Sequence, residues 1–272
     1  KSLPDDLSLV ELVGPDGWKH KWLEENNIEK SILKGLKEAT FSATGLIMDF
    51  REGGQKGIES FEMHEYLGTS ILLGRPSEDD NLPGKHAGIS SLADVGDLAL
   101  LMSSQARSRD GLVGIHHSEN EHENIEKLLE LNPDFVVHLC HATDEDLEKL
   151  KESNISVVVC PRSNDYFGNR PPLEKMIEIG LDLGFGTDNG MICTVNMLDE
   201  IRFIDQNYSS IGKHKILEIA CFGLNEMFNK DEASRYFNPK LSGWALLSRE
   251  ASDNYESVFS PKTTVLGARW RN

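Results

Sequence analysis

Four side chains that can bind a metal ion or move a proton follow short apolar segments of the chain. His116 and Glu119 form an H-x-x-E pair, His138 lies in the next apolar segment, and Asp188 follows a later one. Imidazole nitrogens and carboxylate oxygens are zinc ligands in proteins, and the same groups serve as general acids and bases. A single residue of this kind is more often structural. Their repetition at successive segment ends predicts one shared site.

The elements that must position these side chains form an alternating series. Short β-branched runs alternate with helical patterns, which is typical of βα units on a parallel sheet. We expect seven strands, at residues 46–50, 70–73, 87–89, 112–116, 135–139, 155–160 and 181–186. A closed (β/α)8 barrel needs one more strand, which we expect before Lys1. The predicted fold class is therefore an α/β, TIM-like barrel, in which reacting groups lie at the carboxyl ends of the strands.

The pattern changes near residue 238. Residues 244–248 and 263–270 are strand-like, with no helix expected between them. We expect residues 1–238 to form the barrel and residues 239–272 to form the C-terminal part of a small β domain. The first strands of that β domain would also precede Lys1.

The composition argues against several classes of partner. The 272 residues include 28 Lys and Arg and 45 Asp and Glu, and the net charge of −17 repels nucleic acids and anionic lipid surfaces. No apolar run approaches the ~20 residues that a membrane span needs. The four cysteines form no C-x-x-C pair, so we expect them to be reduced and mostly buried. These features predict a cytoplasmic protein without a nucleic-acid or membrane partner.

Four short motifs occur in an order that resembles a known superfamily. They are H-x-x-E at 116–119, H-L-C-H at 138–141, C-P-R-S-N at 160–164 and G-T-D at 186–188. The sequence resembles the amidohydrolase superfamily, in the branch with cytosine, guanine and adenosylhomocysteine deaminases and the predicted archaeal chlorohydrolases. The H-x-H pair of that branch does not occur among the nine histidines. We expect this pair to precede Lys1, on the first strand.

The resemblance implies a mechanism and a cofactor. One divalent metal, zinc or alternatively iron, would be held by His116 and Asp188 together with the H-x-H pair. Asp188 would also take a proton from water, His138 would orient that water, and Glu119 would protonate a ring nitrogen. The implied reaction is hydrolytic deamination of an amino-substituted heterocycle, which is a small-molecule substrate.

Three arginines follow predicted strands and bear on the substrate. Arg51 and the adjacent Glu52 follow residues 46–50, Arg75 follows residues 70–73, and Arg162 lies in the C-P-R-S-N motif. Either the arginines pair with neighbouring carboxylates, or they hold a carboxylate or phosphate of an anionic substrate, since Arg binds such groups in a bidentate manner. We assign these residues, and Asn164 of the same motif, to substrate binding.

Two alternatives stay open at this point. The same site could remove chloride or open a cyclic amide, because an activated water serves each reaction. If the H-x-H pair is truly absent, the chain would instead be a degenerate barrel that binds a small molecule or a partner without turnover. The resemblance also allows a homo-oligomer, although no segment of the sequence defines an interface.

Overall fold

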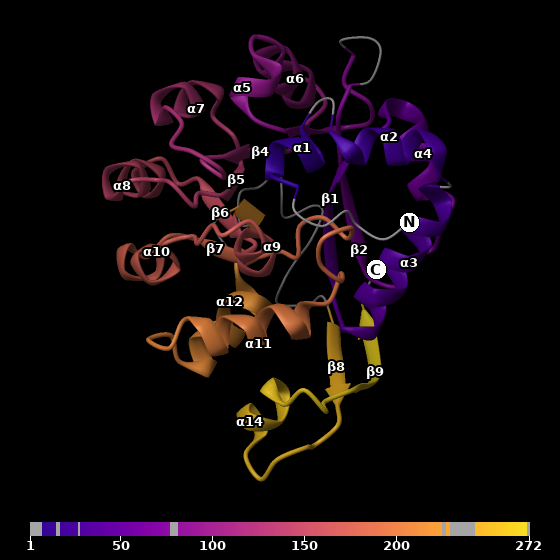
Figure 1. Cartoon of the computed structure of the whole chain (residues 1–272), viewed down its shortest axis with the longest axis vertical. Coiled ribbons are helices and arrows are strands. Elements are labelled where there is room, and N and C mark those ends of the chain that lie inside the picture. The colour runs from indigo at the N-terminus through magenta and orange to yellow at the C-terminus, as the bar shows by residue number, and fades with distance from the viewer. Residues whose placement is uncertain are drawn as a thin grey trace.

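A curled sheet of seven parallel strands forms the centre of the computed structural model, which describes residues 7–14, 17–26, 28–76, 81–224, 227–228 and 243–270. The strands pair in chain order, so each neighbours the next one along the sequence (Figure 1). They are β1 (Leu46–Arg51), β2 (Thr69–Gly74), β3 (His86–Ile89), β4 (Val113–His117), β5 (Phe135–His138), β6 (Ser156–Val159) and β7 (Leu183–Phe185). The seven predicted strands are confirmed, and β1 and β7 are the two edges of the sheet.

The sheet is buried on both faces, as parallel sheets are. Alternate residues of β5 belong to two different apolar clusters: Phe135 and Val137 pack with Ile71 and Leu73, whereas Val136 packs in the large cluster shared with the helices. Gly114 on β4 makes room for the Phe135 ring, which would lie 2.3 Å from a Cβ at that position. Close packing therefore fixes which residues of each strand face the inside of the curl.

Helices connect the strands and cover the outside of the sheet (Figure 1). Their ends carry the expected capping chemistry: Thr143 and Asp146 form a capping box, and Gly180 ends its helix with a φ of 75°. The helices before β7 are α1 (Leu9–Val13), α2 (Trp18–Glu25), α3 (Ile28–Phe41), α4 (Gly54–Glu62), α5 (Leu92–Val95), α6 (Leu98–Arg107), α7 (Ile125–Leu131), α8 (Asp144–Glu152), α9 (Pro161–Tyr166) and α10 (Leu173–Ile179). After β7 come α11 (Met197–Asn207) and α12 (Lys213–Phe222).

A two-stranded antiparallel sheet stands beside the barrel (Figure 1). Its strands are β8 (Gly243–Leu247) and β9 (Val265–Trp270), and the Trp270 ring packs on Gly45, just before β1. The expectation of no helix between the two strands is wrong, because α14 (Asn254–Phe259) lies there. Asp253 caps this helix and Phe259 anchors it in the large apolar cluster. The predicted domain boundary at residue 238 lies outside the described residues.

The four cysteines were expected to be reduced and mostly buried. All four cysteines are free, but the expectation that most are buried is wrong: Cys160 is buried, Cys140 and Cys193 are half-buried, and Cys221 is exposed.

In the part of the chain that the structure describes, the helices are all too short or too polar to cross a membrane.

Candidate active site

Three of the predicted site residues meet at the carboxyl ends of β4 and β5. One ligand atom from each of His116, Glu119 and His138 lies within 4.8 Å of the other two. His138 Nε2 is 3.3 Å from His116 Nδ1 and 3.5 Å from Glu119 Oε2. The separation of these atoms suits the coordination sphere of one divalent ion. The structure thus brings together three of the four residues of the predicted site, and Asp188 lies outside this group.

Several residues at these strand ends have a left-handed backbone conformation. Ser118, His138, Leu139 and Asp188 all have positive φ angles, between 49° and 79°, although none is glycine. Such conformations cost about 1–3 kcal/mol each and persist where the surroundings impose them. Glu123 imposes the turn after β4, because its carboxylate accepts the Ser118 N–H at 2.9 Å. This turn directs Glu119 back toward the strand ends.

His138 is fully buried and is held by a neighbour in the C-P-R-S-N motif. Asn164 Nδ2 lies 3.0 Å from His138 Nδ1, and Asn164 Oδ1 is buried without a hydrogen-bond partner. The two ends of an amide side chain are interchangeable in shape, and the reversed orientation gives Oδ1 a partner in the His138 Nδ1–H. His138 Nε2 would then present its lone pair to the centre of the site, which fits a metal or its water.

His116 is suited to binding a metal because it is neutral. Burial, and after it the neighbouring His138 ring, lower the pKa of His116 well below its ordinary value. The Phe50 ring meets the imidazole edge-on, with ring centroids 4.6 Å apart. His117, the next residue, points to the other face of β4, is 1% exposed and lies 3.0 Å from Ser118 Oγ, as expected for a residue of the barrel wall.

The two carboxyl groups of the predicted site have different environments. Burial, and after it the negative charge of Asp188, raise the pKa of Glu119, although His138 acts in the opposite direction. Asp188 accepts a hydrogen bond of 2.5 Å from Ser163 Oγ and lies outside the group of three residues described above. Glu119 is thus suited to carry a proton, and Asp188 is held in a fixed orientation beside it.

The three arginines all pair with carboxylates in the structure. Arg75 Nη1 is 2.6 Å from Glu52 Oε1, which also accepts from Lys19 at 2.7 Å. Burial alone would raise the pKa of Glu52, but Arg75 and Lys19 lower it to about 2. Arg51 pairs with Asp49 at 3.1 Å. The geometry thus favours the alternative in which the arginines pair with neighbouring carboxylates. A contact between these arginines and the substrate stays a prediction.

Arg162 pairs with a residue that sequence reasoning did not single out. Its Nε lies 3.1 Å from Glu200 Oε2, and Glu200 is fully buried on α11. In the structure Glu200 shares the buried face of α11 with Ile201 and Ile204, which the sequence alone did not reveal. Lys19 was also missed, because its partner Glu52 is distant in sequence.

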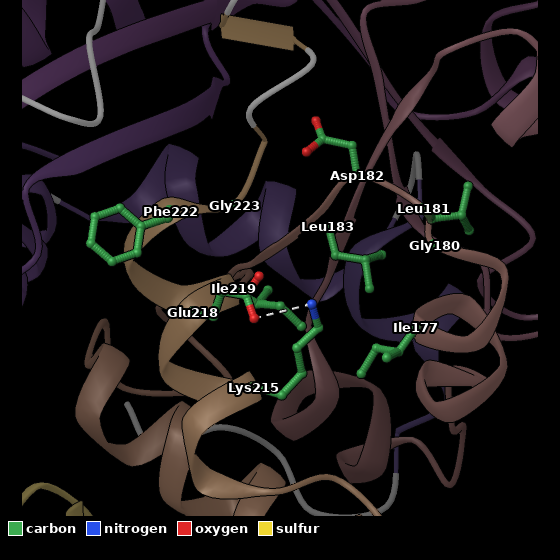
Figure 2. A pocket seen from close by; sticks show the side chains of 10 residues that line it. All are labelled: Ile177, Gly180, Leu181, Asp182, Leu183, Lys215, Glu218, Ile219, Phe222 and Gly223. Atoms are coloured by element: carbon green, nitrogen blue, oxygen red, sulfur yellow. Dashed lines mark hydrogen bonds and ion pairs between the residues drawn. The ribbon is translucent and has the colours of Figure 1, made fainter.

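A cavity at the other end of the barrel is separate from these residues. It lies between α10, α12 and the residues that lead into β7 (Figure 2). The Lys215 ammonium group closes one side by pairing with Glu218 at 3.2 Å. Because this cavity is near the amino end of β7, the carboxyl-end residues remain the candidate site. The lining residues are Ile177, Gly180, Leu181, Asp182, Leu183, Lys215, Glu218, Ile219, Phe222 and Gly223.

Comparison with known proteins identifies the family. The amidohydrolase family model matches residues 100–220, which carry the H-x-x-E, H-L-C-H, C-P-R-S-N and G-T-D motifs. A protein of Archaeoglobus fulgidus that is thought to be an aminohydrolase is 33% identical over 246 residues, covering 87% of this chain and 72% of that protein. The chain belongs to the amidohydrolase family. The resemblance inferred from the four motifs is thereby confirmed.

Two further similarities agree with the family assignment. A 5-methylthioadenosine/S-adenosylhomocysteine deaminase of Caldanaerobacter subterraneus is 40% identical over 73 residues, which are 26% of this chain and 17% of that enzyme. The crystal structure of an adenosine deaminase from Xanthomonas campestris with bound zinc superposes with a TM-score of 0.64 at 15% identity. That match covers 82% of this chain and 62% of the other, and it supports the barrel fold class.

Proposed function

We propose that this protein is a metal-dependent hydrolase that releases ammonia from an amino-substituted heterocycle. The observation that carries the proposal is the convergence of His116, Glu119 and His138 at the carboxyl ends of adjacent strands. A neutral imidazole, a carboxyl group with a raised pKa and a second, oriented imidazole supply the groups that hydrolytic deamination needs. The substrate is a small molecule, and we propose a cytoplasmic location.

We propose that zinc is the metal and that His116 and Asp188 contribute two of its ligands. The ion would supply Lewis acidity and bring the pKa of an attacking water close to neutrality. Asp188 is fixed by Ser163 for this role, and its free oxygen can accept the proton that the water loses. The geometry also allows Glu119 and His138 to reach the same ion, so ligand assignment is the first point to test.

Glu119 and His138 would act on the substrate and the water. The raised pKa of Glu119 lets its carboxyl group hold a proton more readily than an ordinary glutamate, so it could donate that proton to a ring nitrogen and then relay a second proton to the departing amine. His138, fixed by Asn164, would orient the attacking water and stabilise the oxygen that becomes negatively charged. These roles require Glu119 and His138 to face the same bound water as the ion that His116 would hold.

The direct test is ammonia release by the full-length protein loaded with zinc. Aminated purines, pyrimidines and pterins are the substrates, Glu119→Gln is the test variant, and Glu121→Gln is the matched control because Glu121 is exposed on the same turn. We expect turnover by the wild type and the control, and loss of about two orders of magnitude or more in Glu119→Gln. Full activity of Glu119→Gln would contradict the proposal.

The same assay separates the alternatives. Chloride release from chlorinated analogues, without ammonia release from the aminated ones, would assign the site to dechlorination, and opening of a cyclic amide would assign it to amide hydrolysis. Tight binding of a heterocycle without any product would support a binding barrel.

A further inference from the structure

The short helix α9 contacts both sides of the candidate site. Ser163 Oγ donates to Asp188 Oδ2 at 2.5 Å, and the next residue, Asn164, contacts His138 Nδ1 at 3.0 Å. Ser163 and Asn164 are both fully buried. Whatever fixes this short helix therefore fixes the position of Asp188 relative to His138.

Arg162, the residue before Ser163, anchors this helix to α11. Its backbone N–H donates to Glu200 Oε1 at 2.9 Å, while its Nε lies 3.1 Å from Oε2 of the same carboxylate. Glu200 is fully buried, and burial raises its pKa to about 7 despite the pairing. A buried carboxylate is retained only where charged or polar partners compensate for its lost hydration, and Arg162 supplies these partners.

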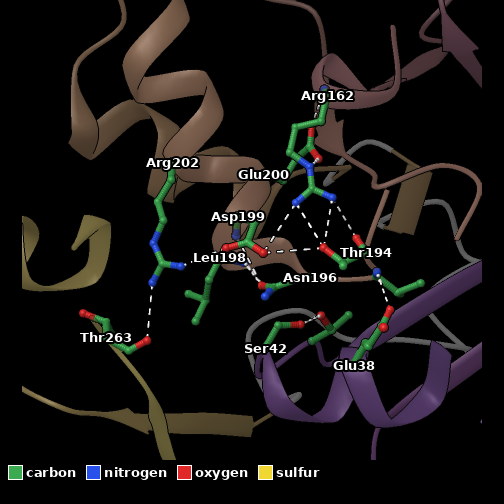
Figure 3. A network of polar contacts seen from close by, with 12 residues as sticks. Glu38, Ser42, Arg162, Thr194, Asn196, Leu198, Asp199, Glu200, Arg202 and Thr263 are labelled. Carbon is green, nitrogen blue, oxygen red and sulfur yellow. Dashed lines mark hydrogen bonds and ion pairs between the residues drawn. The ribbon is translucent and has the colours of Figure 1, made fainter. Parts of the chain in front are cut away.

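The far end of the Arg162 side chain reaches the segment that follows Asp188. Nη2 donates to the carbonyl oxygen of Thr194 at 2.8 Å, and both Nη atoms lie within 3.5 Å of Thr194 Oγ1 (Figure 3). The side chain is only 13% exposed. The guanidinium group is therefore already engaged with Glu200 and Thr194, which leaves little of it for a substrate.

The peptide group between Thr194 and Val195 is also held by a residue of α3. The N–H of Val195 donates to Glu38 Oε2 at 3.0 Å, and the Val195 side chain lies 3.7 Å from the position of a Cβ at Gly35. Glu38 and Gly35 belong to α3, which leads into β1, whereas Val195 follows β7. Since β1 and β7 are the sheet edges, this contact joins the two ends of the curled sheet.

We propose that Arg162, Glu200 and Glu38 form a clamp that positions Asp188 and His138, and that Arg162 does not bind the substrate. The clamp holds the Thr194–Val195 peptide between a guanidinium group and a carboxylate, and it holds α9 through Glu200. These are positioning residues, because none of them reaches the group of His116, Glu119 and His138. The kinetic consequences of the clamp rest on the proposed function, whereas its structural consequences do not.

The test compares Arg162→Met with a matched control at the opposite end of the sheet. Arg107 Nη1 pairs with Asp134 at 2.7 Å, and its Nη atoms donate to the carbonyl oxygens of Gly111 and Asn132. Arg107→Met therefore removes a similar set of contacts near the amino ends of β4 and β5. Any effect that both variants share reports on stability, and an effect confined to Arg162→Met reports on the clamp.

Hydrogen exchange of the full-length protein is the primary measurement, because it needs no substrate. We expect amides of residues 188–196 to exchange about tenfold faster in Arg162→Met and in Glu38→Ala, and at the wild-type rate in Arg107→Met. Glu38→Gln keeps an acceptor oxygen for the Val195 N–H and should restore much of the protection. Equal exchange of these amides in Arg162→Met and Arg107→Met would overturn the clamp.

Zinc competition and kinetics test whether the clamp positions the site. We expect zinc affinity or kcat to fall about tenfold to a hundredfold in Arg162→Met, as for other residues that orient ligands, with equal changes in KM for neutral and anionic substrates. A rise in KM for the anionic substrate alone would make Arg162 a substrate-binding residue and overturn the proposal. If the wild type releases no ammonia, the proposed function fails, and exchange and zinc affinity still decide on the clamp.

Discussion

The two sides of the barrel mouth use charged and titratable residues in opposite ways. After β4 and β5, ligand atoms of His116, Glu119 and His138 converge, and burial moves the pKa of His116 down and that of Glu119 up. After β1 and β2, Arg75 and Glu52 neutralise each other with help from Lys19. The first side retains groups that can react. On the second side the ion pairs of Arg75, Glu52 and Lys19 hold these side chains in place, and we call these three residues the wall. We therefore expect substitutions on the two sides to differ in kind.

The largest effect should come from His138→Asn. Removing the imidazole takes away the group proposed to stabilise developing negative charge, and such losses reduce kcat about a hundredfold to a thousandfold. Steady-state kinetics on the best aminated substrate measure the effect. Because Arg75→Met is expected to change kcat far less, similar losses in both variants would remove the distinction between the two sides.

A smaller kinetic effect is expected from Asn164→Leu. Leucine fills similar space but cannot orient His138, so kcat should fall about tenfold to a hundredfold. The free energy of unfolding should fall by about 1–3 kcal/mol, because His138 Nδ1 loses its hydrogen-bond partner in a fully buried position. Urea denaturation checks the second expectation. A large loss of stability with unchanged kcat would show that Asn164 serves packing alone.

On the opposite side, Arg75→Met should affect stability more than turnover. The change leaves Glu52 with Lys19 as its remaining ion-pair partner, and we expect a loss of about 2 kcal/mol in the free energy of unfolding at neutral pH. In the Glu52→Gln background, where the carboxylate is already gone, the further change Arg75→Met should cost less than it does in the wild type. Additive losses in the double-mutant cycle would show that the pair is not coupled.

The Arg75–Glu52 pair also predicts an acid dependence of stability. The pKa of Glu52 is lowered to about 2, so the stability it contributes is present above about pH 4.5 and is lost as the pH falls toward 2. Thermal unfolding between pH 5 and 2 should show a smaller loss in Glu52→Gln than in the wild type. Identical pH profiles would contradict this account of the wall.

The smallest expected effect is a pH dependence at Glu200. Burial raises its folded-state pKa to about 7, above the ordinary value of 4.5, so the folded protein holds a proton that the unfolded chain releases. The stability from this group is present below pH 4.5 and is lost as the pH rises through 7. The Tm of Glu200→Gln should lack this decline, and a decline equal to that of the wild type would place its origin elsewhere.

Local sequence patterns predicted the strands and the residues at their ends, because strand periodicity and the order of the four motifs are local properties. The partners of the arginines were not predictable in the same way. Glu200 is 38 residues from Arg162 and Lys19 is 33 residues from Glu52, so these pairs depend on tertiary packing. The positive φ angles of His138 and Asp188 were also not predictable, because His and Asp tolerate this conformation but adopt it only at some positions. Helix α14 was missed because its anchor, Phe259, packs on the distant barrel.

The zinc content and turnover of Glu119→Gln and Asp188→Asn, measured side by side in the full-length protein, test the central claim most directly. If His116 and Asp188 hold the ion while Glu119 acts on the substrate, Glu119→Gln should keep about one zinc per chain and lose turnover, and Asp188→Asn should lose both. Zinc lost from Glu119→Gln and retained by Asp188→Asn would show that His116, Glu119 and His138 are the ligands, and would contradict the proposed division of roles.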